Sequence, residues 1–210
     1  MKILHIKSNC FQSIPPKNWG ALEKMIWNYK IQFELIGHDF DILERTEVND
    51  WNNYDVIHCH VYDDALFLKE KGIKYFFSFN DHNAYINGKD SPIFKLNYEA
   101  IKNAEIAFVY APYLVDTFDN MPLLMKHGVN TSLYTPSLET RNKEILCVGN
   151  NGYCGETTIS DRKGFKKALD ISIKTNKNIT FVGPTDCNKQ FFQQNKDYFS
   201  TKTHDVLYDL

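Results

Sequence analysis

Short runs of consecutive apolar residues alternate along this chain with stretches in which apolar residues recur every three or four positions. The runs occupy residues 3–6, 40–43, 56–59, 75–79, 106–109, 123–125, 145–148 and 179–182. Continuous apolar runs of this length are typical of strands that are buried on both faces. Their alternation with helical stretches predicts right-handed crossovers and an α/β fold with a Rossmann-type, doubly wound parallel sheet.

The helical periodicity is clearest between the first two runs. The apolar face of this stretch consists of Leu22, Met25, Ile26, Tyr29, Phe33 and Ile36. Gly37 follows, and a glycine just past the last periodic residue is a common helix end. A second helix is expected from about Asp63 to Lys71, before Gly72. A third has its apolar face at Phe165, Ala168, Leu169 and Ser172.

Polar residues follow several of the predicted strands. The first run leads into Lys7-Ser8-Asn9, the third into His60, the fourth into Asn80-Asp81-His82-Asn83, and the seventh into Gly149-Asn150-Asn151-Gly152. In a doubly wound sheet, ligands bind outside the carboxyl ends of the strands. The sequence therefore predicts a binding site at this edge of the sheet.

The composition is that of an ordinary globular protein. Of 210 residues, 43% are hydrophobic and 24% are charged. The net charge is −2, and the lysines are scattered along the chain rather than clustered. This balance argues against a nucleic-acid partner. The N-terminal apolar run is short, and no stretch is long enough to span a bilayer, so we expect a cytoplasmic protein without an integral membrane segment. The five cysteines contain no Cys-x-x-Cys pair, which argues against a disulfide framework or a structural zinc site.

Two segments could bind an anion at the start of a helix. Gly20 opens the first helix, where a glycine lets backbone N–H groups approach a phosphate closely, although it could simply ease a tight turn. Arg162 and Lys163 precede the helix that begins near Phe165. Cations at a helix N-terminus oppose the helix dipole, and a bound anion would relieve the conflict. The alternative is that both are solvated surface cations.

A third segment, residues 55–60, places two histidines on one face of a strand. His58 and His60 are two residues apart and share a face, while Cys59 points to the other. We expect His58 in the core and His60 facing a cleft. Asp81 and His82 could complete a metal cluster, but no carboxylate–histidine helix spacing accompanies them, so no metal is predicted.

These segments resemble the motifs of GT-B glycosyltransferases of the retaining family-four type (glycosyl transferases group 1). Residues 15–23 are similar to the family's Pro-x-x-Tyr-Gly-Gly-x-Glu, and residues 55–60 to its Asp-Val-Ile-His-x-His. Residues 77–83 correspond to Thr-x-His-Asp, with Asn80 at the histidine position and His82 two residues on. The alternative for Asn80 and Asp81 is an ordinary turn.

Two further matches lie around the middle of the chain. Residues 127–136 resemble the family's interdomain Asn-Gly-Val-Asp, three residues, Phe, one residue, Pro, with His127, Asn130 and Tyr134 as the departures. Gly149-Asn150 and Lys163-Gly164 resemble the family's Gly-Arg…Lys-Gly, with Asn150 at the position of the family's arginine. The resemblance covers nearly the whole chain in the right order.

The resemblance implies two domains and a reaction. Residues 1–139 would form the N-terminal acceptor-side domain, and residues 140–210 the start of a truncated C-terminal donor domain. A sugar would pass from a nucleotide-sugar donor to a glycan, lipid or protein acceptor, without metal or cofactor and with retention. The implied catalytic and acceptor-side residues are His60, Asn80 and His82. The implied donor-binding residues are Gly20, Gly149, Asn150, Arg162 and Lys163.

Other interpretations stay open. A complete second Rossmann-like domain needs on the order of 150 residues, and the family's Glu-x7-Glu segment has no counterpart here. The chain is therefore either a piece of a longer enzyme or a non-catalytic nucleotide-sugar-binding module that needs a partner. A sugar-nucleotide epimerase is a weaker alternative. A homo-oligomer is compatible with the sequence. The sequence does not indicate which nucleotide base and sugar the donor carries, or what the acceptor is.

Overall fold

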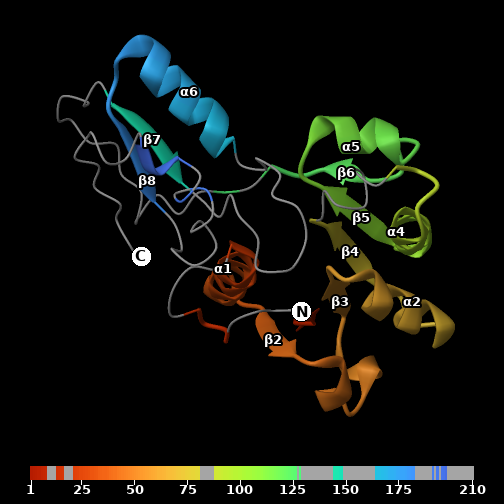
Figure 1. Cartoon of the computed structure of the whole chain (residues 1–210). Coiled ribbons are helices and arrows are strands. Elements are labelled where there is room, and N and C mark those ends of the chain that lie inside the picture. Colours follow the sequence, from red (N-terminus) through yellow and green to blue (C-terminus); the bar gives the residue numbers. More distant parts are fainter. Residues whose placement is uncertain are drawn as a thin grey trace. The chain divides into compact units, whose positions relative to one another are not determined.

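The structure is a computed structural model that describes residues 1–8, 13–16, 21–80, 88–126, 128, 144–148, 164–182, 191, 193 and 195–197. The chain divides into two compact units, Met1–Tyr134 and Thr135–Leu210. Figure 1 shows the helices and strands of both.

The described part of the first unit contains a six-stranded parallel sheet. Its strands, in chain order, are β1 (Lys2–Ile6), β2 (Asp39–Leu43), β3 (Val56–Cys59), β4 (Phe76–Phe79), β5 (Ile106–Val109) and β6 (Leu123–Leu124). They lie in the order β2-β1-β3-β4-β5-β6, and every neighbouring pair is parallel. The predicted α/β fold with a doubly wound parallel sheet is confirmed.

Helices lie on both sides of this sheet (Figure 1). They are α1 (Ala21–Leu35), α2 (Tyr62–Glu70), α4 (Pro92–Asn103) and α5 (Pro112–Thr117), with short 3-10 turns η1 (Arg45–Glu47) and η2 (Trp51–Asn53). The first two confirm the predicted helices. The helices α4 and α5 were not predicted, although Ser91 and Pro92 form a readable start signal: the Ser91 hydroxyl accepts from the Phe94 N–H at 3.1 Å.

Glycines end α1 and α2, as the sequence predicts. Gly37 and Gly72 have φ values of +84° and +69°, in the left-handed region. The Gly72 N–H donates to the Lys69 carbonyl and the Ile73 N–H to the Leu68 carbonyl, both at 2.9 Å. This is the Schellman arrangement, which satisfies carbonyls at a helix end and requires a left-handed residue.

The core of the first unit lies between the sheet and its helices. Its largest fully buried side chains include Tyr75, Phe77, Phe79, Phe118, Leu4 and Leu68. The rings of Phe94 and Phe118 are stacked with centroids 5.1 Å apart, and Phe79 meets Phe118 edge-on at 5.0 Å. Aromatic pairs at these distances stabilise a core beyond the area that they bury.

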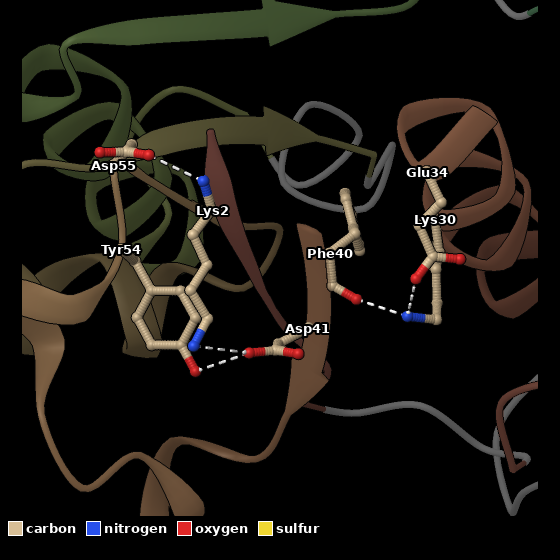
Figure 2. Close-up of polar contacts among 7 residues, drawn as sticks. All are labelled: Lys2, Lys30, Glu34, Phe40, Asp41, Tyr54 and Asp55. Carbon is tan, nitrogen blue, oxygen red and sulfur yellow. Dashed lines mark hydrogen bonds and ion pairs between the residues drawn. The ribbon is translucent and has the colours of Figure 1, made fainter. Parts of the chain in front are cut away.

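Polar contacts join the amino ends of the first strands (Figure 2). The Lys2 N–H donates to Asp55 Oδ2 at 2.7 Å, and the Asp55 N–H donates to the Lys2 carbonyl at 2.8 Å. The Tyr54 hydroxyl donates to Asp41 Oδ2 at 3.0 Å, and Lys30 Nζ donates to the Phe40 carbonyl at 2.5 Å. These bonds fix β1, β2 and the start of β3 at the edge opposite to the predicted site.

The described part of the second unit is a β-α-β arrangement. Strands β7 (Ile145–Val148) and β8 (Ile179–Val182) are parallel, and α6 (Phe165–Thr175) connects them in sequence. The core contains Phe165, Leu169, Ile179, Phe181 and Phe191. Both strands and the helix confirm the sequence prediction. Among the described residues of either unit, no helix combines the length and apolar character needed to cross a membrane.

Candidate functional site

The order of the strands changes direction between β1 and β3. From β1 the chain moves outward to β2, and from β3 it moves the other way, through β4 and β5 to β6. The two crossovers therefore leave neighbouring strands in opposite directions, and in doubly wound sheets ligands bind at this position, outside the carboxyl ends of the strands. Ser8 lies just after β1 and His60 just after β3, so both residues are at this point.

Three histidines are hydrogen-bonded to one another across β1 and β3. His5, which is fully buried, is in register with His58 of β3. His5 Nδ1 lies 3.0 Å from His58 Nδ1, and His5 Nε2 lies 3.1 Å from His60 Nδ1. Because successive side chains of a strand alternate between faces, His58 and His60 both reach the same central ring.

The hydrogen bonds continue from His58 toward the next strands. His58 Nε2 lies 2.7 Å from the hydroxyl of the buried Ser78, in β4. The Tyr110 hydroxyl, just after β5, donates to Ser78 Oγ at 3.3 Å and lies 3.2 Å from the Tyr29 hydroxyl of α1. We call this set, His60, His5, His58, Ser78, Tyr110 and Tyr29, the histidine chain.

Burial keeps the three rings uncharged. It lowers the pKa of His60 to about 4 and that of His58 to about 3, and it places the pKa of His5 well below its ordinary value. The neighbouring rings reinforce the effect on His5 and His58, since two protonated rings in contact would repel each other. At pH 7 each ring therefore has one N–H donor and one lone-pair acceptor.

Among the described residues, two buried side-chain polar atoms have no hydrogen-bond partner. They are His60 Nε2 and Oδ2 of Asp64, which lies in the first turn of α2. The backbone of Ser8 and the charge of the buried Glu23 both act to raise the pKa of His60, but less strongly than burial lowers it. Since buried polar groups are nearly always hydrogen-bonded, these two atoms are candidates for contact with a ligand or an ordered water.

Asp64 is held by a cation from the β2–β3 connection. Its Oδ1 lies 3.5 Å from Arg45 Nη1, and the guanidinium stands over the Phe67 ring at 4.7 Å from the centroid. Burial raises the pKa of Asp64, while the Ser8 hydroxyl and Arg45 act to lower it. The edge therefore presents a neutral imidazole beside acidic groups, which suits a ligand with hydroxyl groups.

The histidine geometry does not suit a single metal ion. His5 uses Nδ1 toward His58 and Nε2 toward His60, on opposite sides of its ring, so one ion could not meet all three residues. Within the described ranges, no group of three or more His, Cys, Asp or Glu side chains could hold a metal. Cys59 is fully buried and burial raises the pKa of its thiol, so it is an inert core residue.

Only two of the residues predicted for the site are among the described ones. His60 lies at the carboxyl end of β3, and Asn80 is exposed directly after the neighbouring strand β4. The others lie outside the described residues: His82, Gly20, Gly149, Asn150, Arg162 and Lys163. The functional roles of all eight stay predictions.

The sequence analysis did not identify His5, Ser78, Tyr110 or Tyr29 as members of a site. His5 lies inside an apolar run, and Ser78 between two phenylalanines, so each resembles a core position. A polar residue inside a buried strand is a usable signal, but its partner depends on the strand order. Only the adjacency of β1, β3 and β4 brings these side chains together.

Comparison with known proteins shows a likeness to solved structures but not to known sequences. No protein-family model and no curated protein matches the sequence. The fold is similar to the crystal structure of AviGT4, a glycosyltransferase involved in avilamycin A biosynthesis, with a TM-score of 0.58 and 11% sequence identity. The match covers 100% of this chain, which spans 64% of the length of that glycosyltransferase. The protein therefore has a glycosyltransferase-like Rossmann fold.

Proposed function

We propose that this chain takes part in glycosyl transfer from a nucleotide-sugar to a hydroxyl group of a carbohydrate or glycoconjugate acceptor. The observation that carries the proposal is the neutral His60 ring, whose Nε2 is buried and unpartnered at the carboxyl end of β3. It lies where the strand order changes direction, in a fold that is similar to a glycosyltransferase.

The first unit would bind the acceptor. His60, Asn80 and His82 follow β3 and β4 in the sequence, and we assign them to the acceptor hydroxyls. An imidazole and an amide can each donate and accept a hydrogen bond, which suits the hydroxyl groups of a sugar. The charge of the buried Glu23 acts on His60 and disfavours an anionic group of the acceptor at this ring.

The motif resemblance assigns Gly20, in the first unit, and Gly149, Asn150, Arg162 and Lys163, in the second, to the donor diphosphate. A backbone N–H at a glycine-containing helix start and the cation of a lysine or arginine are each groups that would stabilise the charge that develops on a leaving diphosphate. The sugar would pass through an oxocarbenium-like state. The family-four assignment and retention of configuration belong to this proposal and rest on the motif resemblance.

The proposal is tested by binding and turnover. The chain is incubated with UDP-, GDP- and dTDP-sugars, and its melting temperature is measured; a ligand that binds only the folded state raises it. A donor that stabilises the chain is then tested for acceptor-dependent release of nucleotide. Lys163→Ala should reduce turnover by roughly 100-fold, the typical effect of removing one charge-stabilising donor. Lys174→Ala, an exposed lysine of α6, is the matched control and should leave turnover unchanged.

Each result separates the alternatives. No stabilisation by any donor contradicts the proposed function. Stabilisation without turnover favours a nucleotide-sugar-binding module, and a new sugar-nucleotide isomer without acceptor favours an epimerase. Undiminished turnover in Lys163→Ala contradicts the role of that lysine alone.

A further inference from the structure

The histidine chain has a definite direction of hydrogen bonding. The two described contacts of the Ser78 hydroxyl are with Tyr110, which donates to it, and with His58 Nε2. Since Tyr110 supplies its own hydrogen, the Ser78 hydrogen is left for His58 Nε2. If the Ser78 hydroxyl donated to nothing, a buried hydrogen-bond donor would be left unsatisfied, which is unfavourable.

This direction passes through the three rings in turn. A neutral imidazole has one hydrogen, so a His58 ring that accepts at Nε2 carries it on Nδ1 and donates to His5 Nδ1. His5 then carries its hydrogen on Nε2 and donates to His60 Nδ1. His60 in turn carries its hydrogen on Nε2, which is the atom without a partner.

We propose that His5, His58 and Ser78 are positioning residues that hold His60 in the Nε2–H tautomer, so that its Nε2–H donates to a hydroxyl oxygen of a neutral, sugar-like ligand. The hydrogen bond partner of one ring nitrogen normally sets the state of the other. Here that control begins at Ser78, in the neighbouring strand β4, and passes through His58 and the buried His5 to His60.

The charges at this edge favour a neutral ligand over an anion. The His60 ring is uncharged at neutral pH, and the acidic group whose charge acts on it is that of the buried Glu23. Asp64 is the other buried acid after β3, and its carboxyl group contacts Arg45. A phosphate would meet no cation among these groups, apart from Arg45, which is already paired with Asp64. The assignment of the ligand as a sugar rests on the proposed function, whereas the tautomer control does not.

The tautomers are measured directly by NMR. The full chain is labelled with 15N-histidine, and long-range 1H–15N correlations at neutral pH identify the protonated nitrogen of each ring. The expected pattern is Nδ1–H for His58 and Nε2–H for both His5 and His60. A His60 ring protonated on Nδ1 in the unaltered protein would overturn the proposal without need of any variant.

A substitution of Ser78 tests whether control begins there. Ser78→Ala removes the donor to His58 Nε2, and we expect His60 to lose its single tautomer, while Ser78→Thr, which keeps the hydroxyl, should retain it. Ser172→Ala is the matched control: Ser172 is also fully buried, and its hydroxyl donates to the Lys177 carbonyl in the second unit. Unchanged His60 signals in a folded Ser78→Ala protein would contradict the proposal.

A ligand titration tests the chemical class separately. Glucose, galactose and mannose are added to the labelled protein, with inorganic phosphate as the other arm. We expect a monosaccharide to shift the His60 Nε2–H signal more than those of His5 and His58, and phosphate to leave it in place. If only phosphate shifts the His60 Nε2–H signal, or if neither phosphate nor any of the three monosaccharides does, the assignment of a neutral, sugar-like ligand is overturned. The tautomer pattern is unaffected by whether any nucleotide-sugar is turned over, so the two proposals can fail independently.

Discussion

His5 and His58 occupy registered positions on the neighbouring parallel strands β1 and β3, and their Nδ1 atoms lie 3.0 Å apart. Two imidazoles at this distance form a hydrogen bond only if one of the two Nδ1 atoms is unprotonated and accepts from the other. Burial keeps both rings neutral, so each has one unprotonated nitrogen. Protonation of both would place two like charges in contact within the core. The stability of the first unit therefore depends on the proton concentration.

We expect the free energy of unfolding to fall as the pH is lowered. The folded-state pKa values of the three histidines lie below their ordinary value of 6.5, so the unfolded chain binds more protons than the folded protein below that pH. The stabilisation is fully present above about pH 6.5 and is lost as the pH falls through about 4, the pKa of folded His60. For His60 alone the loss is on the order of 3 kcal/mol, at about 1.4 kcal/mol per pKa unit.

Urea unfolding at a series of pH values measures this loss. His58→Gln removes one of the shifted groups, and the pH dependence should become shallower even if the variant is less stable at neutral pH. His38→Gln removes a histidine outside the histidine chain and should retain the slope. Equal slopes in His58→Gln and the unaltered protein would show that acid acts on other groups.

Arg45 is expected to stabilise the fold by pairing with the buried Asp64. Arg45→Met keeps an apolar side chain over Phe67 but leaves the Asp64 carboxylate without a cation. Breaking a fully buried pair costs about 3–5 kcal/mol. Because the Arg45 side chain is 38% exposed, we expect a smaller loss of about 1–2 kcal/mol.

The Arg45 result is checked by a double-mutant cycle in urea at neutral pH. Once Asp64 is replaced by Asn, Arg45→Met should cost much less, since no buried charge is left behind. Additive losses from the two substitutions would mean that Arg45 acts through its packing on Phe67 rather than through its charge.

The left-handed conformation of Gly72 should make an alanine costly there. No atom lies within 4 Å of the place that a Cβ would take, so the penalty comes from the backbone alone. We expect Gly72→Ala to lower the free energy of unfolding by about 1–2 kcal/mol, and Gly72→Asn by less. Gly128→Ala is the matched control, because Gly128 also has open space but lacks the left-handed φ. Equal losses at the two sites would contradict this explanation.

Tyr54 is expected to contribute through its hydroxyl. Tyr54→Phe removes the hydrogen bond to Asp41 and keeps the ring under Lys2 Nζ, which lies 4.9 Å from the centroid. We expect a loss of about 0.5–1.5 kcal/mol. Tyr62→Phe removes a partly exposed tyrosine hydroxyl with no described hydrogen bond, and its effect should stay within about 0.5 kcal/mol. If Tyr54→Phe lowers the free energy of unfolding no more than Tyr62→Phe does, the hydrogen bond to Asp41 does not contribute to stability.

The strands were predicted from the hydrophobic pattern, but not all of the helices were. A buried parallel strand is usually a nearly continuous apolar run, which the sequence displays directly, and Ile106–Val109 is an example. The helix α4 was not predicted, although Phe94, Ala100 and Ile101 are buried at helical spacing and Ser91 and Pro92 mark its start. The helical pattern was therefore readable there, even with Asn97 on the buried face.

The position of His60 could be predicted, but its environment could not. Alternation along β3 places His58 and His60 on one face, and the end of a strand is a common location for ligand-binding residues. That His5 lies between them depends on β1 being adjacent to β3, which no local pattern encodes. The tautomer of His60 depends further on Ser78, on another strand again.

The separation of 53 residues between His5 and His58 also affects the order of events during synthesis. At ~5–20 residues per second, roughly 3 to 10 seconds pass between the two. During this interval β2 can pair with one side of β1, while the other side has no partner strand. An apolar strand with an open side can pair with other nascent chains, and a polar residue within it opposes this. Because His5 interrupts the apolar run of β1, it makes the open side of this strand less favourable for pairing with other chains until β3 has been synthesised.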